Sequence, residues 1–209
     1  MTTRLTRAEQ VERNHELVLE AAQRVLLARG YAGATLEAIA REAGFSRGVV
    51  YSQFASKADL VLELLERRIT ERAEHNAALA AAGSGREGLR ALLRSNAARD
   101  DASHAWGRLL IEFRVHAARD PELNRRYAAL HEQSISHFTD AIAALLDRGG
   151  VVPERPPRVI AELVFSLAAG HTLEQAAGTA RLGHADLEDA VERLVGPPPS
   201  PRHPPGDPR

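Results

Sequence analysis

Polar side chains of the kinds that bind nucleic-acid bases gather in one short segment near the N-terminus. Arg47, Ser52 and Gln53 lie within seven consecutive residues, between apolar neighbours. If the segment is a helix, these three side chains form its polar side, which faces either solvent or the major groove of a duplex. A carboxamide pairs with adenine, so Gln53 could read that base. The alternative is that Arg47 is a solvated surface charge.

A second group of residues could bind a metal ion or act in acid–base catalysis. Five histidines lie between His104 and His171, and Glu112 precedes His116 by four residues, which puts both on one helical face. The chain has neither cysteine nor an HExxH motif, so no zinc-ligand spacing supports a metal site. No nucleophile and base are paired either. We therefore expect no metal, no cofactor and no enzymatic activity. The alternative is an all-helical enzyme that uses Glu112 and the histidines.

Composition favours a helical protein. Of 209 residues, 44% are hydrophobic, 26% charged and only 4% aromatic, and alanine, leucine, glutamate and arginine dominate. No stretch approaches the roughly 20 apolar residues that span a bilayer, and the N-terminus lacks the apolar core of a secretion signal. We expect a cytoplasmic protein with no membrane partner. Residues 1–57 carry eight basic against six acidic side chains, a net +2 that is weak evidence for a polyanionic partner.

Apolar repeats of three and four residues, with capping residues at their ends, predict about nine helices and no strand. In the N-terminal part the predicted helices span residues 9–29, closed by Gly30; 36–43, between Thr35 and Gly44; and 47–54, begun by Ser46. The remaining predicted helices span about 57–82, 86–100, 103–118, 121–147, 158–182 and 185–195. Seven prolines among the last fourteen residues predict that the tail, 196–209, is disordered.

Two short helices joined by a four-residue turn have the size of a helix-turn-helix. Gly44 suits the sharp turn, because glycine adopts a positive φ without strain. Ile39 and Ala40 on the first helix and Val50 on the second are expected to pack against the long N-terminal helix. The predicted fold is therefore all-α, with an N-terminal three-helix helix-turn-helix unit and a larger helical C-terminal unit.

The run Thr35–Leu60 closely resembles the DNA-binding signature of the TetR (tetracycline-repressor-like) family, and Gly30-Tyr31 fits the same pattern. The resemblance implies a DNA-binding domain over 1–57 and a ligand-binding and dimerisation domain over 58–195. It also implies a sequence-specific transcriptional regulator, a repressor that a small-molecule effector releases from a palindromic operator. The alternative is a helical ligand-binding or scaffold protein without specific DNA binding.

Carried over residue by residue, the resemblance gives roles to single side chains. Thr35, Tyr51 and Lys57 are similar to residues that contact phosphates, and Ser46, Arg47 and Gly48 begin the recognition helix. The DNA-binding residues that we expect are Thr35, Ser46, Arg47, Gly48, Tyr51, Ser52, Gln53 and Lys57. Leu36 and Gln53 depart from the family pattern, which often has threonine and histidine there, so their contacts can differ. Arg4 and Arg7 could form an arm in the minor groove, or be uninvolved.

The resemblance also implies a homodimer through residues 158–195, where small residues permit close helix approach and leucines supply apolar area. An ordinary intramolecular core is the alternative. A ligand pocket would lie among the helices before and within this region. The candidate ligand-binding residues are Trp106, Leu110, Phe113, Arg114, His116, Tyr127, His131, Phe138 and His171. Bulky apolar side chains with a few polar ones fit a ligand cavity and a plain core equally well.

Overall fold

A computed structural model describes residues 6–97 and 101–194, and within these residues the chain forms nine α-helices and no strand. The helices are α1 (Arg7–Gly33), α2 (Leu36–Ala43), α3 (Arg47–Gln53), α4 (Lys57–Ala82), α5 (Gly85–Asn96), α6 (Asp101–Ala117), α7 (Pro121–Arg148), α8 (Pro157–Ala176) and α9 (His184–Leu194). The predicted all-α fold with an N-terminal helix-turn-helix is confirmed. None of the described helices is both long and apolar enough to cross a membrane.

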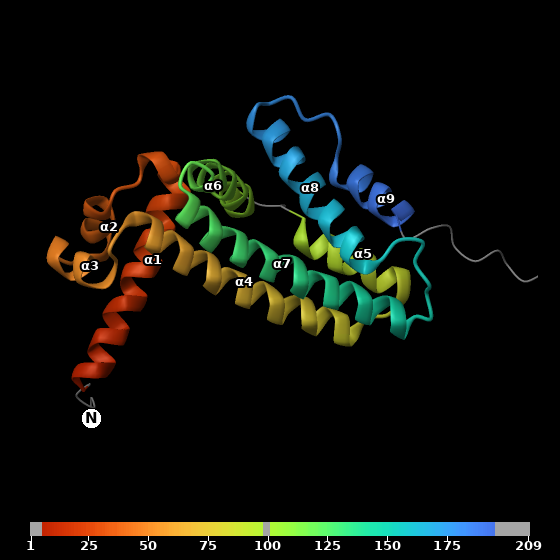
Figure 1. The fold of residues 1–209 in the computed structure, drawn as a ribbon, viewed down its shortest axis with the longest axis horizontal. Helices are drawn as coiled ribbons and strands as arrows, with labels where there is room; N and C mark the ends of the chain where they lie inside the picture. The colour runs from red at the N-terminus through yellow and green to blue at the C-terminus, as the bar shows by residue number, and fades with distance from the viewer. Residues whose placement is uncertain (1–5, 98–100, 195–209) are drawn as a thin grey trace, which may run out of the picture.

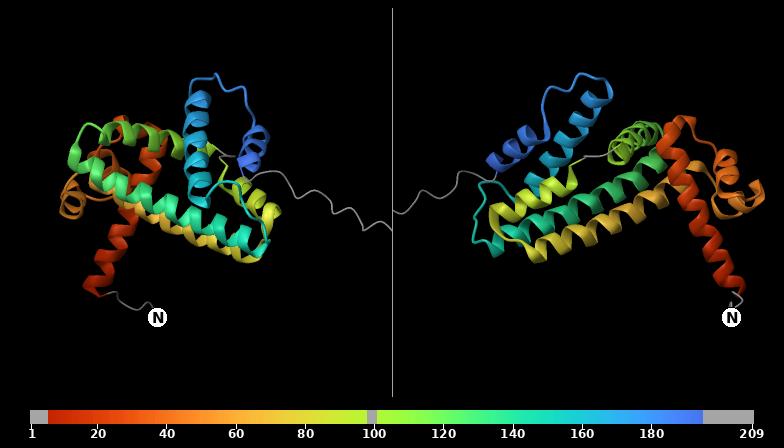
Figure 2. Two further views of the ribbon diagram at one scale, coloured as in Figure 1. Left: turned by 45° about the vertical axis from the view of Figure 1, so that its right-hand side comes forward. Right: turned by 180° about the vertical axis from the view of Figure 1, so that it is seen from behind.

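Helices α4 and α7 lie side by side and form the long axis of the molecule (Figure 1). At one end, α2 packs against α1 and α3 against α2, and α6 crosses near the C-terminal end of α1 (Figure 2). At the other end, α5 and α8 pack against α7, and α9 packs against α5 and α8. Two hydrophobic clusters follow this division. One joins α1–α4 to the adjoining parts of α6 and α7, and the other lies among α5, α7, α8 and α9.

Capping residues set most helix ends where the sequence predicts them. Thr35 accepts a hydrogen bond from the backbone N–H of Ala38, and Gly44 closes α2 in the left-handed conformation, so the predicted span 36–43 is confirmed. Asp120 accepts hydrogen bonds from two backbone N–H groups at the start of α7, directly before Pro121. Because these signals are local, they can be read without knowledge of the tertiary structure.

Helix α8 ends six residues before the predicted limit at Leu182, so the prediction for residues 177–182 is wrong. Gly178 adopts a φ of +70°, and its N–H bonds back to the carbonyl of Gln175. The N–H of Thr179 bonds to the carbonyl of Glu174, which closes the last turn. The apolar repeat continues past this glycine as far as Leu182, so periodicity alone predicts a longer helix than the one that forms.

Gly30 interrupts α1 without ending it. The glycine has φ 68° and ψ 177°, a conformation open essentially to glycine alone, and one further turn follows it. A Cβ at this position would lie 2.7 Å from the carboxylate of Glu112 on α6. Gly30 is therefore required for the bend in the backbone, and any other residue would also push the Glu112 carboxylate away from its hydrogen bond to the Tyr31 N–H.

Three predictions stay outside what the fold tests. Arg4 and the proline-rich tail, 196–209, lie outside the described residues. Arg7 is the first residue of α1, after the N-cap Thr6. The proposed domain boundary at 57/58 falls at the first residue of α4 and stays a prediction.

Replacing Gly30 with alanine should destabilise the protein more than replacing Gly44, whose φ is +73° but whose Cβ would meet nothing within 4 Å. We expect Gly44→Ala to cost about 1 kcal/mol and Gly30→Ala about 3 kcal/mol, since the latter adds a clash with Glu112 to the backbone strain. Chemical denaturation of the two variants measures the difference. Equal losses would contradict the close contact between α1 and α6.

Candidate nucleic-acid interface

The core of the helix-turn-helix is built as predicted. Ile39 and Val50 are fully buried and Ala40 nearly so, in the same cluster as the apolar side of α1. Phe54, at the end of α3, is also buried, as expected of a core residue. Because α3 is only two turns long and Val50 faces inward, the opposite side of the helix is left to solvent.

Most of the predicted contact residues lie on this outward side. Exposed residues among them are Thr35, Ser46, Arg47, Gly48, Tyr51 and Ser52. The hydroxyl of Ser46 makes no capping hydrogen bond to α3. The nearest atom to a Cβ built on Gly48 is the Ser46 hydroxyl at 3.8 Å, an ordinary contact. Packing within the described protein therefore gives no reason for a glycine in this helix, whereas close approach of an external partner does.

Tyr51 is half exposed and already has a hydrogen-bond partner. Its hydroxyl donates to Glu37 Oε1 on α2 at 2.9 Å, and 50% of the residue surface is open to solvent. The bond to Glu37 raises the pKa of Tyr51. The pKa of Glu37 is lowered, first by its own backbone N–H and then by the Tyr51 hydroxyl. Tyr51, which is predicted to bind a phosphate, is thus held beside a carboxylate.

Gln53 points toward α1 instead of the outward face. Its amide oxygen lies 3.2 Å from His15 Nδ1, and the other ring nitrogen of His15 bonds to the carboxylate of Glu63 on α4. The His15 ring also stacks on Phe54, with ring centroids 5.1 Å apart. Three helices therefore meet through one imidazole, which holds the C-terminal end of α3. The pairing of Gln53 with adenine stays a prediction that would require Gln53 to leave His15.

The ammonium group of Lys57, the first residue of α4, lies at the C-terminal end of α1. It donates to the carbonyls of Tyr31 at 2.6 Å and Ala34 at 2.8 Å, and it lies 4.2 Å from the centroid of the Tyr31 ring. Burial lowers the pKa of Lys57, which the Glu112 carboxylate opposes. Two of the three ammonium hydrogens are used in these bonds, which leaves one for the predicted phosphate.

Glu112 belongs to the same arrangement. Its carboxylate accepts the backbone N–H of Tyr31 at 2.7 Å, while the Tyr31 ring contacts Phe113 and His116. We call the contacts of Lys57 and Glu112 with residues 30–34 the α1 junction.

Within the described residues, no three or more histidine, aspartate or glutamate side chains come together in a way that could hold a metal ion.

Several candidate ligand-binding residues form a chain of ring contacts instead of an open pocket. The chain runs from Tyr31 through Phe113, Tyr127 and His131 to Phe165, with each pair of centroids 5.2–6.0 Å apart. Phe138 contacts the far end of the chain. Trp106 is buried beneath the guanidinium of Arg68, and burial lowers the pKa of His131. Leu110 and His171 are half-buried, and Arg114 and His116 are exposed.

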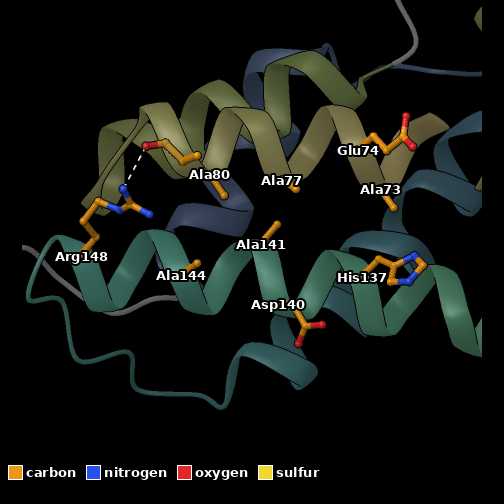
Figure 3. A pocket seen from close by; sticks show the side chains of 10 residues that line it. Ala73, Glu74, Ala77, Ala80, His137, Asp140, Ala141, Ala144 and Arg148 are labelled. Carbon is orange, nitrogen blue, oxygen red and sulfur yellow. Dashed lines mark hydrogen bonds between the residues drawn. The ribbon is translucent and has the colours of Figure 1, made fainter. Parts of the chain in front are cut away.

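Two cavities lie elsewhere. The larger is a groove of about 500 Å³ between α4 and α7, where Ala73, Ala77 and Ala80 face Ala141 and Ala144 (Figure 3). The smaller, about 300 Å³, lies between α6 and α8 and is lined by His104, Arg108, Thr172 and Gln175. None of the nine candidate ligand-binding residues lines either cavity, so their role stays a prediction.

The fold and the outward side of α3 define a helix-turn-helix transcriptional regulator. Residues 18–64 match the profile of bacterial regulatory proteins of the tetR family. Residues 85–196, more than half of the chain, match the profile of the C-terminal part of BetI-type transcriptional repressors. The chain therefore belongs to the TetR family of DNA-binding transcriptional regulators, as the resemblance of residues 35–60 predicts.

Relatives along most of the chain are regulators too. The uncharacterized HTH-type regulator YfiR of Bacillus subtilis is 25% identical over 177 residues, which cover 81% of this chain and 83% of YfiR. The repressor AcnR of Corynebacterium glutamicum is 25% identical over 182 residues, 85% of this chain and 90% of AcnR. A protein from Saccharomonospora viridis, solved in complex with choline, shares the fold with a TM-score of 0.72 over 88% of this chain and 96% of its own, at 18% identity.

Sequence reasoning missed the partners of the predicted residues. Glu37, His15 and Glu63 hold Tyr51 and Gln53, and Glu112 was considered only for metal binding or catalysis. A hydrogen bond between side chains 14 or more residues apart leaves no periodic signal in the sequence. The one available clue was Gly30, whose conformation exposes backbone groups that need partners.

Replacing Gly48 with alanine should stabilise the fold and weaken DNA binding at the same time. The new methyl group meets no close neighbour, so helix propensity alone should add about 0.5 kcal/mol to the free energy of unfolding. The same methyl group would stand between α3 and a duplex, so affinity should fall by about tenfold, the loss of one good contact. Thermal denaturation and fluorescence anisotropy measure the two effects. Loss of both stability and affinity would contradict this assignment.

Proposed function

We propose that the protein is a homodimeric repressor that binds a palindromic operator and releases it when a small molecule binds to the C-terminal helices. The observation that carries the proposal is the outward side of α3, where Arg47 and Tyr51 are exposed around an unobstructed glycine, Gly48. A short helix that presents polar side chains and an open backbone fits the major groove. The site of action is the cytoplasm, where the operator is.

The proposed contacts divide into base readers and phosphate ligands. Arg47 is exposed at the first position of α3, so it is the main candidate for base contact. Ser46 and Tyr51 present hydroxyl groups at the start and on the side of α3, and Thr35 presents one at the start of α2; these are the proposed phosphate contacts. Ser52, Gln53 and Lys57 complete the proposed set, with Gln53 and Lys57 also holding α3 and α4 in position.

The proposed dimer uses α8 and α9. Beyond Ala161 no residue of α8 is buried, and two of its leucines are open: Leu167 is 37% and Leu173 53% exposed. A Cβ on Gly170 would meet nothing within 4 Å. Apolar side chains and small residues on one exposed helix are the features of an unpaired interface. Dimerisation would place two α3 helices about one DNA turn apart, roughly 34–36 Å.

The proposed effector acts through the ring contacts. A ligand that inserts near His131 or Phe165 must displace a ring in the chain that ends at Tyr31. Tyr31 belongs to the α1 junction, so such a shift would move α1, α4 and α6 relative to one another. The choline complex of a protein with the same fold supports a small-molecule site in this architecture. Release follows only if the effector binds the shifted state better than the operator-binding state.

Selection of duplexes from a random pool tests DNA recognition directly. We expect a palindrome to be recovered. Arg47→Ala should weaken its binding by about tenfold or more and relax the preference for one base pair. Arg125→Ala is the control, since Arg125 is an exposed arginine on α7 that pairs with Glu122, and its loss should leave affinity unchanged. Recovery of no preferred sequence would favour a ligand-binding or scaffold protein.

Leu167→Glu should convert the dimer to a monomer, because it places a charge on the exposed apolar side of α8. Sedimentation velocity measures the change. Val115→Glu is the matched control: Val115 is 56% exposed on α6, away from the proposed interface, and the variant should remain dimeric. A monomeric unaltered protein, or a dimer that survives Leu167→Glu, would contradict this interface.

A further inference from the structure

Glu37 and Tyr51 form a hydrogen-bonded pair on the surface that α3 presents to solvent. The two side chains come from different helices, and the hydroxyl of Tyr51 donates to Glu37 Oε1 at 2.9 Å. Half of the Tyr51 surface is exposed, and Glu37 is half-buried. The pair therefore lies where a duplex docked against Arg47 and Gly48 would reach it.

A tyrosine hydroxyl has one hydrogen to donate. A phosphate oxygen and a carboxylate oxygen are both acceptors only, so Tyr51 cannot donate to both at once. In the free protein that hydrogen belongs to Glu37. Any phosphate that binds Tyr51 must take the hydrogen from Glu37 and leave a carboxylate beside a phosphate, both negatively charged.

The surroundings of Glu37 keep it ionised. Its own backbone N–H, in the first turn of α2, and the Tyr51 hydroxyl lower its pKa, and Thr35 and Arg47 add to this effect. The Glu37 carboxylate therefore stays negatively charged beside any phosphate that binds Tyr51.

On this geometry, and on the basis of the function proposed above, we propose that Glu37 is a competing acceptor that weakens DNA binding by holding the Tyr51 hydroxyl. Phosphate contacts carry no sequence information, so Glu37 lowers affinity for operator and unrelated duplex alike. The residue restrains non-specific binding, and only a site with good base contacts to α3 overcomes the restraint. Glu37 is thus a positioning residue that acts through Tyr51.

Glu37→Gln keeps the shape of the side chain and removes its charge. We expect it to tighten binding about threefold to tenfold, the range for removal of one like charge near a phosphate in water. The gain should be the same for the selected palindrome and for a random duplex of equal length, measured by anisotropy. Glu42→Gln is the matched control: Glu42 also lies on α2 but pairs with Arg24 at 2.8 Å, and its loss should change affinity less than about twofold.

A double-mutant cycle with Tyr51→Phe tests whether Glu37 acts through the hydroxyl. Phenylalanine has no hydrogen for either acceptor, so Glu37→Gln should gain less in that background. A readout without DNA is the ultraviolet titration of tyrosine: Glu37→Gln should lower the pKa of Tyr51, the exposed one of three tyrosines, since Tyr31 and Tyr127 are buried.

Each outcome bears on one claim. Weaker binding by Glu37→Gln would mean that Glu37 orients Tyr51 for DNA, and would overturn the inference. Equal gains from Glu37→Gln and Glu42→Gln, or the same gain with and without the Tyr51 hydroxyl, would also overturn it. Failure of the unaltered protein to bind any duplex would overturn the proposed function itself. Binding by the unaltered protein with no change in Glu37→Gln would overturn the inference alone.

Discussion

The position of the helix-turn-helix depends on how the backbone groups at the broken end of α1 are satisfied. The bend at Gly30 removes helical partners from the residues that follow, and unpaired backbone groups inside a protein are costly. Side chains from two other helices supply the missing partners: Lys57 of α4 bonds to the carbonyls of Tyr31 and Ala34, and Glu112 of α6 bonds to the Tyr31 N–H. The orientation of α1, and of α2 and α3 packed on it, is therefore fixed by α4 and α6 together.

These contacts couple the C-terminal helices to the helix-turn-helix. Helix α6 contributes both Glu112 and the ring of Phe113, which packs against Tyr31 and continues through Tyr127 toward α8. At the opposite corner, His15 joins α1 to Gln53 of α3 and Glu63 of α4. Movement of α4 would shift His15 and its partner Gln53, and movement of α6 would shift the end of α1, so either change would disturb the helix-turn-helix. In the proposed release mechanism, the effector acts through this coupling.

The parts that could be predicted from the sequence are those with local causes. Thr35, Gly44 and the Asp120-Pro121 pair mark helix ends through hydrogen bonds to their immediate neighbours, and those ends were predicted correctly. The directions of Gln53 and Lys57 could not be predicted, since their partners are far away in the sequence. The end of α8 was missed because the apolar repeat continues beyond Gly178. The exposed side of α3 could be predicted, because the inward packing of Val50 turns the opposite side of this short helix toward solvent.

The spacing of the two α3 helices in the proposed dimer tests the role of the α1 junction most directly. The chain has no cysteine, so Ser52→Cys gives one spin label on the exposed side of each α3. Double electron–electron resonance should give a narrow distribution near one DNA turn, about 34–36 Å, with the protein otherwise unaltered. Adding Glu112→Ala should shift or broaden that distribution, since Tyr31 loses its partner on α6. An unchanged distribution would contradict the claim that α6 sets the position of the DNA-binding helices.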